Sequence, residues 1–221
     1  MFATDRDLWI LEPRLFDDIA FSAQARLSNQ PATVGAGSLA LNFTGIDLTA
    51  LGLMPGMVIA LDGYGRFEIT EVTSATALGV SRLRHAHDAP AIPLPIAPST
   101  EVSATVMTFA PQIDLAHRSL LATLGIEPGD VPDGPPEGRV HASQILNPEA
   151  LARAEALSAL HTIYSSASAL LPAHDIHAER AAMYARRAAD QRSRTRAHID
   201  LDHDGITDLT RSPSTTRLRR A

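Results

Sequence analysis

Residues 57–72 read MVIALDGYGRFEITEV, and this stretch determines the class of fold. An apolar run at 57–61 is followed by DGYG, a turn with two glycines, and then by a run in which Phe67 and Ile69 fall on one face. Two such runs separated by a short glycine-containing turn are typical of a β-hairpin. The middle of the chain is therefore expected to form antiparallel sheet.

The segments on both sides of this hairpin show the same period of two. Short alternating or apolar runs occur at 38–44, 77–81 and 102–109. Several short strands in close succession are typical of a small barrel or sandwich. Residues 82–100 contain four prolines and are expected to form an extended loop between the last two strands.

The two ends of the chain have helical patterns instead. Thr4 and Asp7 have the spacing of a capping box, and a second helix is expected to continue through about Arg26. Further helices are predicted at 112–125, from Asn147-Pro148 onward, and from Asp175 as an N-cap. In the middle one of these, apolar residues recur at spacings of three and four, namely Leu157, Leu160, Tyr164, Ala167 and Leu171.

These patterns predict an α+β fold in which a small antiparallel β-barrel or sandwich is inserted into a helical bundle. Residues 1–30 and 110–208 would form the bundle, and residues 31–109 the inserted domain. Residues 209–221 would form an extended basic tail.

Composition restricts the chemistry that the chain can perform. It has no Cys, which excludes disulfides, thiol catalysis and cysteine-ligated zinc. All 19 basic residues are Arg, so no lysine is available for a Schiff base or a phosphate loop. The net charge is −9 over residues 1–150 and +3 over residues 151–221. The N-terminus shows no secretory signal, and the apolar runs are too short to span a bilayer.

The residues of common catalytic motifs do not occur with the required spacing. His85 and His87, next to Asp88, could form a two-histidine metal site, but they lie in the proline-rich loop and no third ligand is evident. There is no GxSxG, no phosphate loop and no GxGxxG after a strand. The sequence therefore favours a non-enzymatic protein over a metal-dependent hydrolase that would use His85 and His87.

Residues 200–211 are similar to a calcium-binding loop. Four aspartates alternate around Gly205: Asp200, Asp202, Asp204 and Asp208. Such an array can wrap oxygen ligands around calcium, and Ile206 would add its backbone carbonyl. The final position, where a bidentate Glu is expected, is Arg211. The loop either binds calcium or a similar cation, or it is an aspartate-rich helix stop without an ion. In both cases it would end the last helix and direct the basic tail.

Two parts of the chain resemble the adaptors, or head–tail connector proteins, of tailed phages and gene transfer agents. One is TDRDLWILEPRLFDDIAF near the N-terminus, and the other is the pair of helices at 155–194 followed by DLDHDG. The likeness covers roughly residues 1–27 and 110–210. The β-region at 31–109 resembles an inserted module found in some longer members.

The resemblance implies a structural virion protein without a required cofactor. Adaptors assemble as a ring, expected to be a dodecamer, between the portal protein and the stopper or tail, and packaged DNA passes through the ring. The chain would then reside in the neck of the virion, after assembly in the host cytoplasm. A C-terminal tail commonly reaches into the portal, and here that role would fall to the following residues: Arg211, Arg217, Leu218, Arg219 and Arg220. The alternative function is a calcium-dependent binding module.

Overall fold

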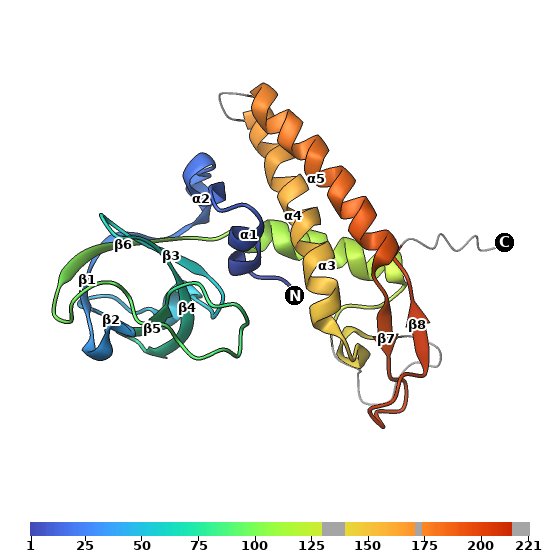
Figure 1. Cartoon of the computed structure of the whole chain (residues 1–221), viewed down its shortest axis with the longest axis horizontal. Coiled ribbons are helices and arrows are strands. Elements are labelled where there is room, and N and C mark those ends of the chain that lie inside the picture. Colours follow the sequence, from blue (N-terminus) through green and yellow to red (C-terminus); the bar gives the residue numbers. More distant parts are fainter. Residues whose placement is uncertain (130–139, 171–173, 214–221) are drawn as a thin grey trace. The chain divides into compact units, whose positions relative to one another are not determined.

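The structure, a computed structural model, describes residues 1–129, 140–170 and 174–213 (Figure 1). It combines helices with a closed antiparallel barrel, so the predicted mixed class is confirmed. The residues divide into two compact units. The barrel unit is Thr4–Phe109, and the helical unit consists of Met1–Ala3 together with the chain from Ala110 onward. The barrel unit is therefore an insertion within the sequence of the helical unit.

The boundaries of the insertion differ from those predicted. Helices α1 (Asp5–Leu11) and α2 (Leu15–Asp18) belong to the barrel unit, not to the helical one. The predicted helix through about Arg26 is wrong, because α2 has four residues and strand β1 already begins at Ala25. The start of β1 is held by pairing with strand β6, more than 70 residues later in the chain. This tertiary pairing overrides the local helical pattern.

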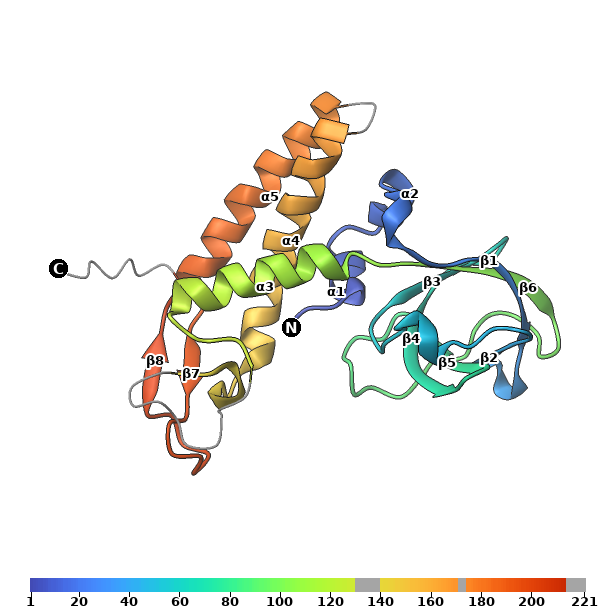
Figure 2. The same ribbon diagram turned by 180° about the vertical axis from the view of Figure 1, so that it is seen from behind.

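Six strands form the barrel, in the order β1-β2-β5-β4-β3-β6, and all neighbours are antiparallel (Figure 2). They are β1 (Ala25–Val34), β2 (Ala40–Phe43), β3 (Val58–Leu61), β4 (Gly65–Ser74), β5 (Ala77–Ser81) and β6 (Glu101–Met107). Short 3₁₀ helices cover Ser22–Gln24, Ala36–Ser38 and Thr49–Leu51. The predicted hairpin at 57–72 is confirmed, with Ala60 opposite Arg66.

Alternation along the strands fills the barrel with apolar side chains. In β6, Val102, Ala104 and Val106 are buried and the residues between them are not. The other strands contribute further buried residues, among them Leu41, Phe43, Ile59, Leu61, Phe67, Ile69, Leu78 and Val80. Each fully buried side chain of this kind contributes about 1.5–3 kcal/mol relative to an exposed one, so the barrel unit has a core of its own.

Helix α1 begins with the predicted capping box. The Thr4 amide donates to Asp7 Oδ2 at 2.8 Å, and two residues later the Arg6 amide donates to the carbonyl oxygen of Gly56 at 2.8 Å. Gly56 has φ +84°, and a Cβ atom there would lie 2.8 Å from the Thr4 side chain. Glycine is therefore required at position 56 for α1 to approach the barrel backbone.

The helical unit contains three long helices and a small hairpin. They are α3 (Ala110–Leu124), α4 (Pro148–Leu170) and α5 (His174–Arg194), followed by β7 (Ala197–Ile199) and β8 (Leu209–Arg211), with a 3₁₀ turn at Ala142–Gln144. Helices α4 and α5 lie side by side and antiparallel, and α3 packs against α4 (Figures 1 and 2). Gly125, with φ +66°, ends α3 as predicted. Asp175 lies in the first turn of α5 and does not precede it as the predicted cap. Among the described residues, no helix is long and apolar enough to cross a membrane.

The α4–α5 pair is joined by two buried tyrosines. The rings of Tyr164 and Tyr184 are stacked, with centroids 5.6 Å apart and planes 9° apart. Arg180 donates to the Tyr164 hydroxyl at 2.8 Å and lies over its ring, and Arg187 lies over the ring of Tyr184. The predicted apolar stripe of α4 is buried as far as Ala167, while Leu171 lies outside the described residues.

The first three residues of the chain are held in the helical unit by a buried carboxylate. Glu155 of α4 is fully buried, and its Oε1 accepts hydrogen bonds from the amides of Phe2 at 3.0 Å and Ala3 at 3.1 Å. Its Oε2 lies 2.8 Å from Nδ1 of His117 in α3, and the ring of His117 is packed edge to face against Phe2. Glu155 thus connects the N-terminal residues, α3 and α4.

Candidate functional site

The aspartate-rich loop is the turn of the β7–β8 hairpin. The chain leaves β7 at Ile199, passes through residues 200–208 and returns in β8, with Ile199 paired to Leu209. The prediction that this loop ends the last long helix is therefore wrong, since strand β7 separates the loop from the end of α5. Two three-residue strands are too short to show a period of two, which explains why the sequence did not reveal them.

The carboxylates of the loop accept hydrogen bonds from the loop's own backbone. Asp200 accepts from the amides of His203 at 2.6 Å and Gly205 at 2.8 Å. Asp204 accepts from Ile206 at 2.7 Å, and Asp208 accepts from the amide of Leu201 at 2.7 Å. Gly205, with φ +83°, permits the reversal of the chain at the centre of the loop. Asp202 accepts from the amide of Asp204 at 3.3 Å, so all four aspartates stabilise the turn of the hairpin through hydrogen bonds.

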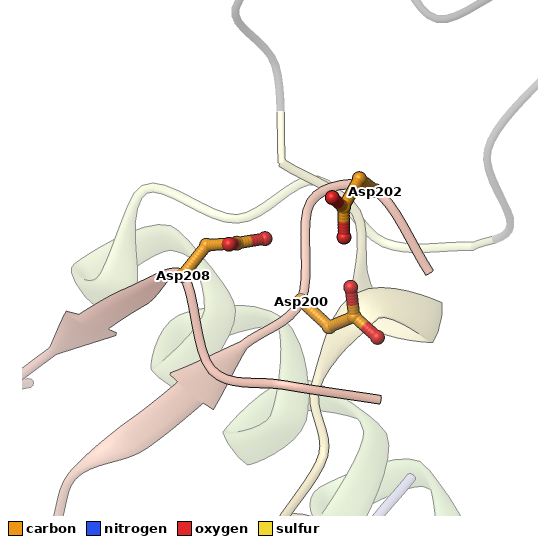
Figure 3. A group of neighbouring side chains, drawn as sticks. All are labelled: Asp200, Asp202 and Asp208. Carbon is orange, nitrogen blue, oxygen red and sulfur yellow. The ribbon is translucent and has the colours of Figure 1, made fainter. Parts of the chain in front are cut away.

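Three of the four predicted ligands come together. One carboxylate oxygen from each of Asp200, Asp202 and Asp208 lies within 4.8 Å of the others, and Figure 3 shows Asp202 and Asp208 pointing toward one another across the loop. Asp204 does not belong to this group. Oxygen ligands of this kind suit a hard cation such as calcium, which takes six to eight of them. The group could therefore supply part of a coordination shell.

The electrostatics of the loop differ between its aspartates. Burial raises the pKa of Asp200, but hydrogen bonds from the amides of Gly205, His203 and Asp204 outweigh this effect and lower its pKa below the usual value. The pKa of Asp202 is raised by burial and by the negative charges of Asp204, Asp208 and Asp200. A nearby cation would relieve this repulsion.

Arg211, which occupies the final position of the calcium-loop pattern, serves another purpose. It lies in β8, and its Nη1 donates to the carbonyl oxygens of Leu124 at 2.9 Å and Gly125 at 2.5 Å. These carbonyls belong to the C-terminal end of α3, where a cation is favourable. Arg211 was predicted to belong to a tail that docks on the portal, but the structure places it in the hairpin. The other predicted tail residues, Arg217, Leu218, Arg219 and Arg220, lie outside the described residues.

Among the described residues, the two loop histidines do not belong to a group of three ligand-type side chains. Nε2 of His87 lies 3.6 Å from Oδ1 of Asp7, and the aspartate group of the hairpin is the one cluster of three ligand-type residues within the described parts of the chain. The arrangement that a hydrolase at His85 and His87 would need is therefore not formed by those parts.

The barrel unit holds a buried ionic cluster that the sequence did not reveal. Glu68 of β4 is fully buried, and its Oε1 accepts from Nη2 of Arg84 at 2.6 Å while its Oε2 lies 3.4 Å from Nε of Arg6. Arg6 also donates to the carbonyl oxygen of Arg84 at 2.5 Å. Glu68 raises the pKa of Arg84 through its hydrogen bond. The cluster fixes the start of the proline-rich loop against the barrel.

A pocket lies beside this cluster on the barrel unit. It has a volume of about 370 Å³ and is lined by the following residues: Trp9, Arg66, Phe67, Arg82, Leu83 and Ile92. Small-molecule and peptide sites typically occupy roughly 300–1,000 Å³ and combine apolar walls with a few polar groups. The signal available in the sequence was Trp9, the single tryptophan of the chain, but the lining residues, Trp9 included, are spread over more than 80 residues.

Comparisons of this chain with protein-family models, with curated proteins and with solved structures give no match.

Proposed function

We propose that this chain is a head–tail connector of a tailed phage or gene transfer agent, which assembles as a ring beneath the portal. The observation that carries the proposal is the organisation of the helical unit. An antiparallel pair, α4 and α5, is covered by α3 and followed by a hairpin that leads directly to the arginine-rich C-terminal residues. The resemblance implies a bundle of helices followed by an aspartate-rich stretch and a C-terminal tail, and the helices and the loop of this unit support the proposal, with the barrel unit as the inserted module.

In this proposal the chain is structural and has no catalytic role. Twelve copies would surround the channel through which packaged DNA leaves, and the stopper or tail would bind the opposite side of the ring. The three arginines near the C-terminus would contact carboxylates of the portal, because guanidinium groups form bidentate hydrogen bonds with carboxylates. The hairpin would determine where this segment leaves the helical unit.

The structure shows from which residue the C-terminal segment can be deleted without removing a strand. Residues 209–211 form β8, so their removal would damage the hairpin. Deletion of residues 214–221 spares every described element. The truncated chain is expected to lose binding to purified portal rings while its melting temperature stays unchanged. As a matched control, Arg186→Ala removes an exposed arginine from α5 and is expected to bind the portal normally.

The same binding measurement separates the connector from a calcium-dependent binding module. A connector is expected to bind portal rings equally well with and without a chelator, whereas a calcium module would lose binding when calcium is removed. Labelling of purified virions with an antibody to this chain, followed by negative-stain electron microscopy, gives an independent result. Label at the head–tail junction is expected, and absence of the chain from the particle would contradict the proposal.

A further inference from the structure

The pocket on the barrel unit is built from three elements. Trp9 comes from α1, Arg66 and Phe67 come from β4, and the remaining wall comes from the start and the middle of the proline-rich loop. Leu83 and Ile92 are 37% and 39% exposed, although they line the pocket together with an indole ring. An apolar side chain from another segment would cover these surfaces.

The loop wall of the pocket is held in place from below. Arg84 follows directly after Leu83 and forms the ionic cluster with Glu68 and Arg6, and Nη1 of Arg84 donates to the carbonyl oxygen of Ala89 at 2.8 Å. The amide of Ile92 donates to the Ser81 hydroxyl at 2.8 Å. Because both ends of this loop wall are fixed, a segment that docks there does not have to order it.

Two arginines, Arg66 and Arg82, line the pocket, and their pairing indicates which charge a docking segment should carry. Arg66 already has partners within the barrel unit: it forms an ion pair with Asp17 at 2.6 Å and donates to the carbonyl oxygen of Phe16 at 3.0 Å. Arg82 is exposed, and among the described residues no carboxylate forms an ion pair with its guanidinium. The pocket therefore fits a segment that presents an apolar side chain next to a carboxylate.

The tip of the β7–β8 hairpin is such a segment. Ile206 is 66% exposed and Leu201 is 47% exposed. Ile206 is flanked by Asp204 and Asp208, and Asp202 lies at the same tip. The hydrogen bonds within the loop make the tip a preformed turn, so little conformational entropy would be lost when it docks.

We propose that the hairpin tip of one copy docks into this pocket of a neighbouring copy, with Ile206 as the apolar anchor and Asp204 paired with Arg82. The inference rests on the proposed function, because it assigns a contact between neighbours of the ring. Tip and pocket are different surfaces, so the contact is heterologous, and contacts of this kind generate closed rings when the rotation between copies closes. The aspartates would then serve to recognise an arginine of the neighbouring subunit.

A cross-linking experiment tests this contact directly, because the chain has no cysteine of its own. One chain carries Thr207→Cys at the tip, and a second, of different size through a tag, carries Ala91→Cys beside Ile92. Both substitutions leave the anchor and the pocket lining intact. After mixing and treatment with a short bis-maleimide, a product joining the two kinds of chain is expected. Leu115→Cys, at an exposed position of α3, replaces Ala91→Cys as the control and is expected to give no such product.

Charge reversal identifies the pair of side chains. Arg82→Glu is expected to lower the yield of the joined product about tenfold, and Asp204→Arg on the other chain is expected to restore it. The inference would be overturned if chains with Arg82 and Asp204 unchanged gave no joined product. It would also be overturned if the Leu115→Cys control gave an equal yield.

The portal-binding measurement separates this inference from the proposed function. Portal binding without cross-linking would reject the contact and leave the connector function standing. Cross-linking without portal binding would keep the contact and reject the connector.

Discussion

At the scale of single residues, one carboxyl group of the barrel unit, that of Asp5, is buried where its ionised form is unfavourable. Asp5 of α1 is 2% exposed, and its Oδ1 accepts from the amide of Phe109 at 2.7 Å. Burial raises the pKa of Asp5 to about 6, although hydrogen bonds from Thr108 and Phe109 and the charge of Arg26 act in the opposite direction. Between about pH 4 and pH 6, Asp5 is therefore protonated in the folded chain and ionised in the unfolded chain.

This proton makes the stability of the barrel unit depend on pH. Because the pKa of Asp5 is higher in the folded state, stability is expected to fall as the pH rises from about 4 to about 6, by on the order of 3 kcal/mol. Asp5→Asn keeps an acceptor for the Phe109 amide and removes the charge. This variant should be more stable than the unchanged chain at pH 8 and should lack the slope between pH 4 and 6. Urea titrations across this range measure both effects, and an unchanged slope in the variant would contradict the assignment to Asp5.

The hairpin aspartates give a second prediction at this scale. Asp200→Ala removes the acceptor for two backbone amides, so the melting temperature of the helical unit should fall at pH 7. Asp202→Asn is the matched control, because it removes a charge that its neighbours repel, and it should leave the melting temperature unchanged or slightly higher. The pKa of Asp200 is lowered by folding, so its contribution is present above the ordinary pKa of about 4 and is lost as the pH falls through the folded value. The difference between the unchanged chain and Asp200→Ala should accordingly vanish at low pH, as followed by circular dichroism.

At the scale of elements, the proline-rich loop is held by charge at its start and by packing further along, where Leu94 and Ile96 are buried in the barrel core. Residues 82–100 contain no helix or strand, yet their start is fixed by the cluster of Arg6, Glu68 and Arg84. Removing one member of a buried ion pair leaves the other charge buried without compensation, which is more costly than the pair is favourable.

Glu68→Gln is therefore expected to destabilise the barrel unit by about 3–5 kcal/mol, because two guanidinium groups lose their buried partner. Glu71→Gln changes an exposed residue of the same strand in the same way and should have little effect. Guanidinium chloride unfolding of both variants provides the comparison. Equal midpoints for the two variants would show that the cluster contributes nothing to stability.

The elements also show what the sequence could and could not predict. The hairpin at 57–72 and strand β5 were predicted correctly because their signals are local: alternation, turn glycines and short length. The helix expected through Arg26 was wrong because β1 pairs with β6, which lies more than 70 residues later in the sequence. The candidate loop was recognised from its aspartates, but its position in a hairpin was not. The ionic cluster depends on Arg6, Glu68 and Arg84, which are too far apart in sequence for any spacing rule to connect.

At the scale of the whole molecule, the chain consists of a barrel inserted into a helical unit, each with its own core. The barrel unit buries the cluster that includes Leu41, Ile59 and Val106, and a separate cluster in the helical unit includes Leu120, Leu151 and Ile199. Units with independent cores of about 100 residues can generally fold alone.

Residues 4–109 produced alone are expected to fold into the barrel and to melt in a single cooperative transition. The intact chain should show a transition at the same temperature for the barrel unit, in addition to one for the helical unit. Differential scanning calorimetry of both samples provides the test. A fragment without a cooperative transition would mean that the barrel needs the helical unit in order to fold.

The buried Glu155 imposes an order of events during synthesis of the chain. Its partners, the amides of Phe2 and Ala3, are synthesised about 150 residues before Glu155. In between, the whole of the barrel unit has emerged and can fold. The N-terminal residues must stay available during this interval and can join α3 and α4 only when α4 has been made. The helical unit therefore closes after the barrel unit, although its residues 1–3 are synthesised before the barrel.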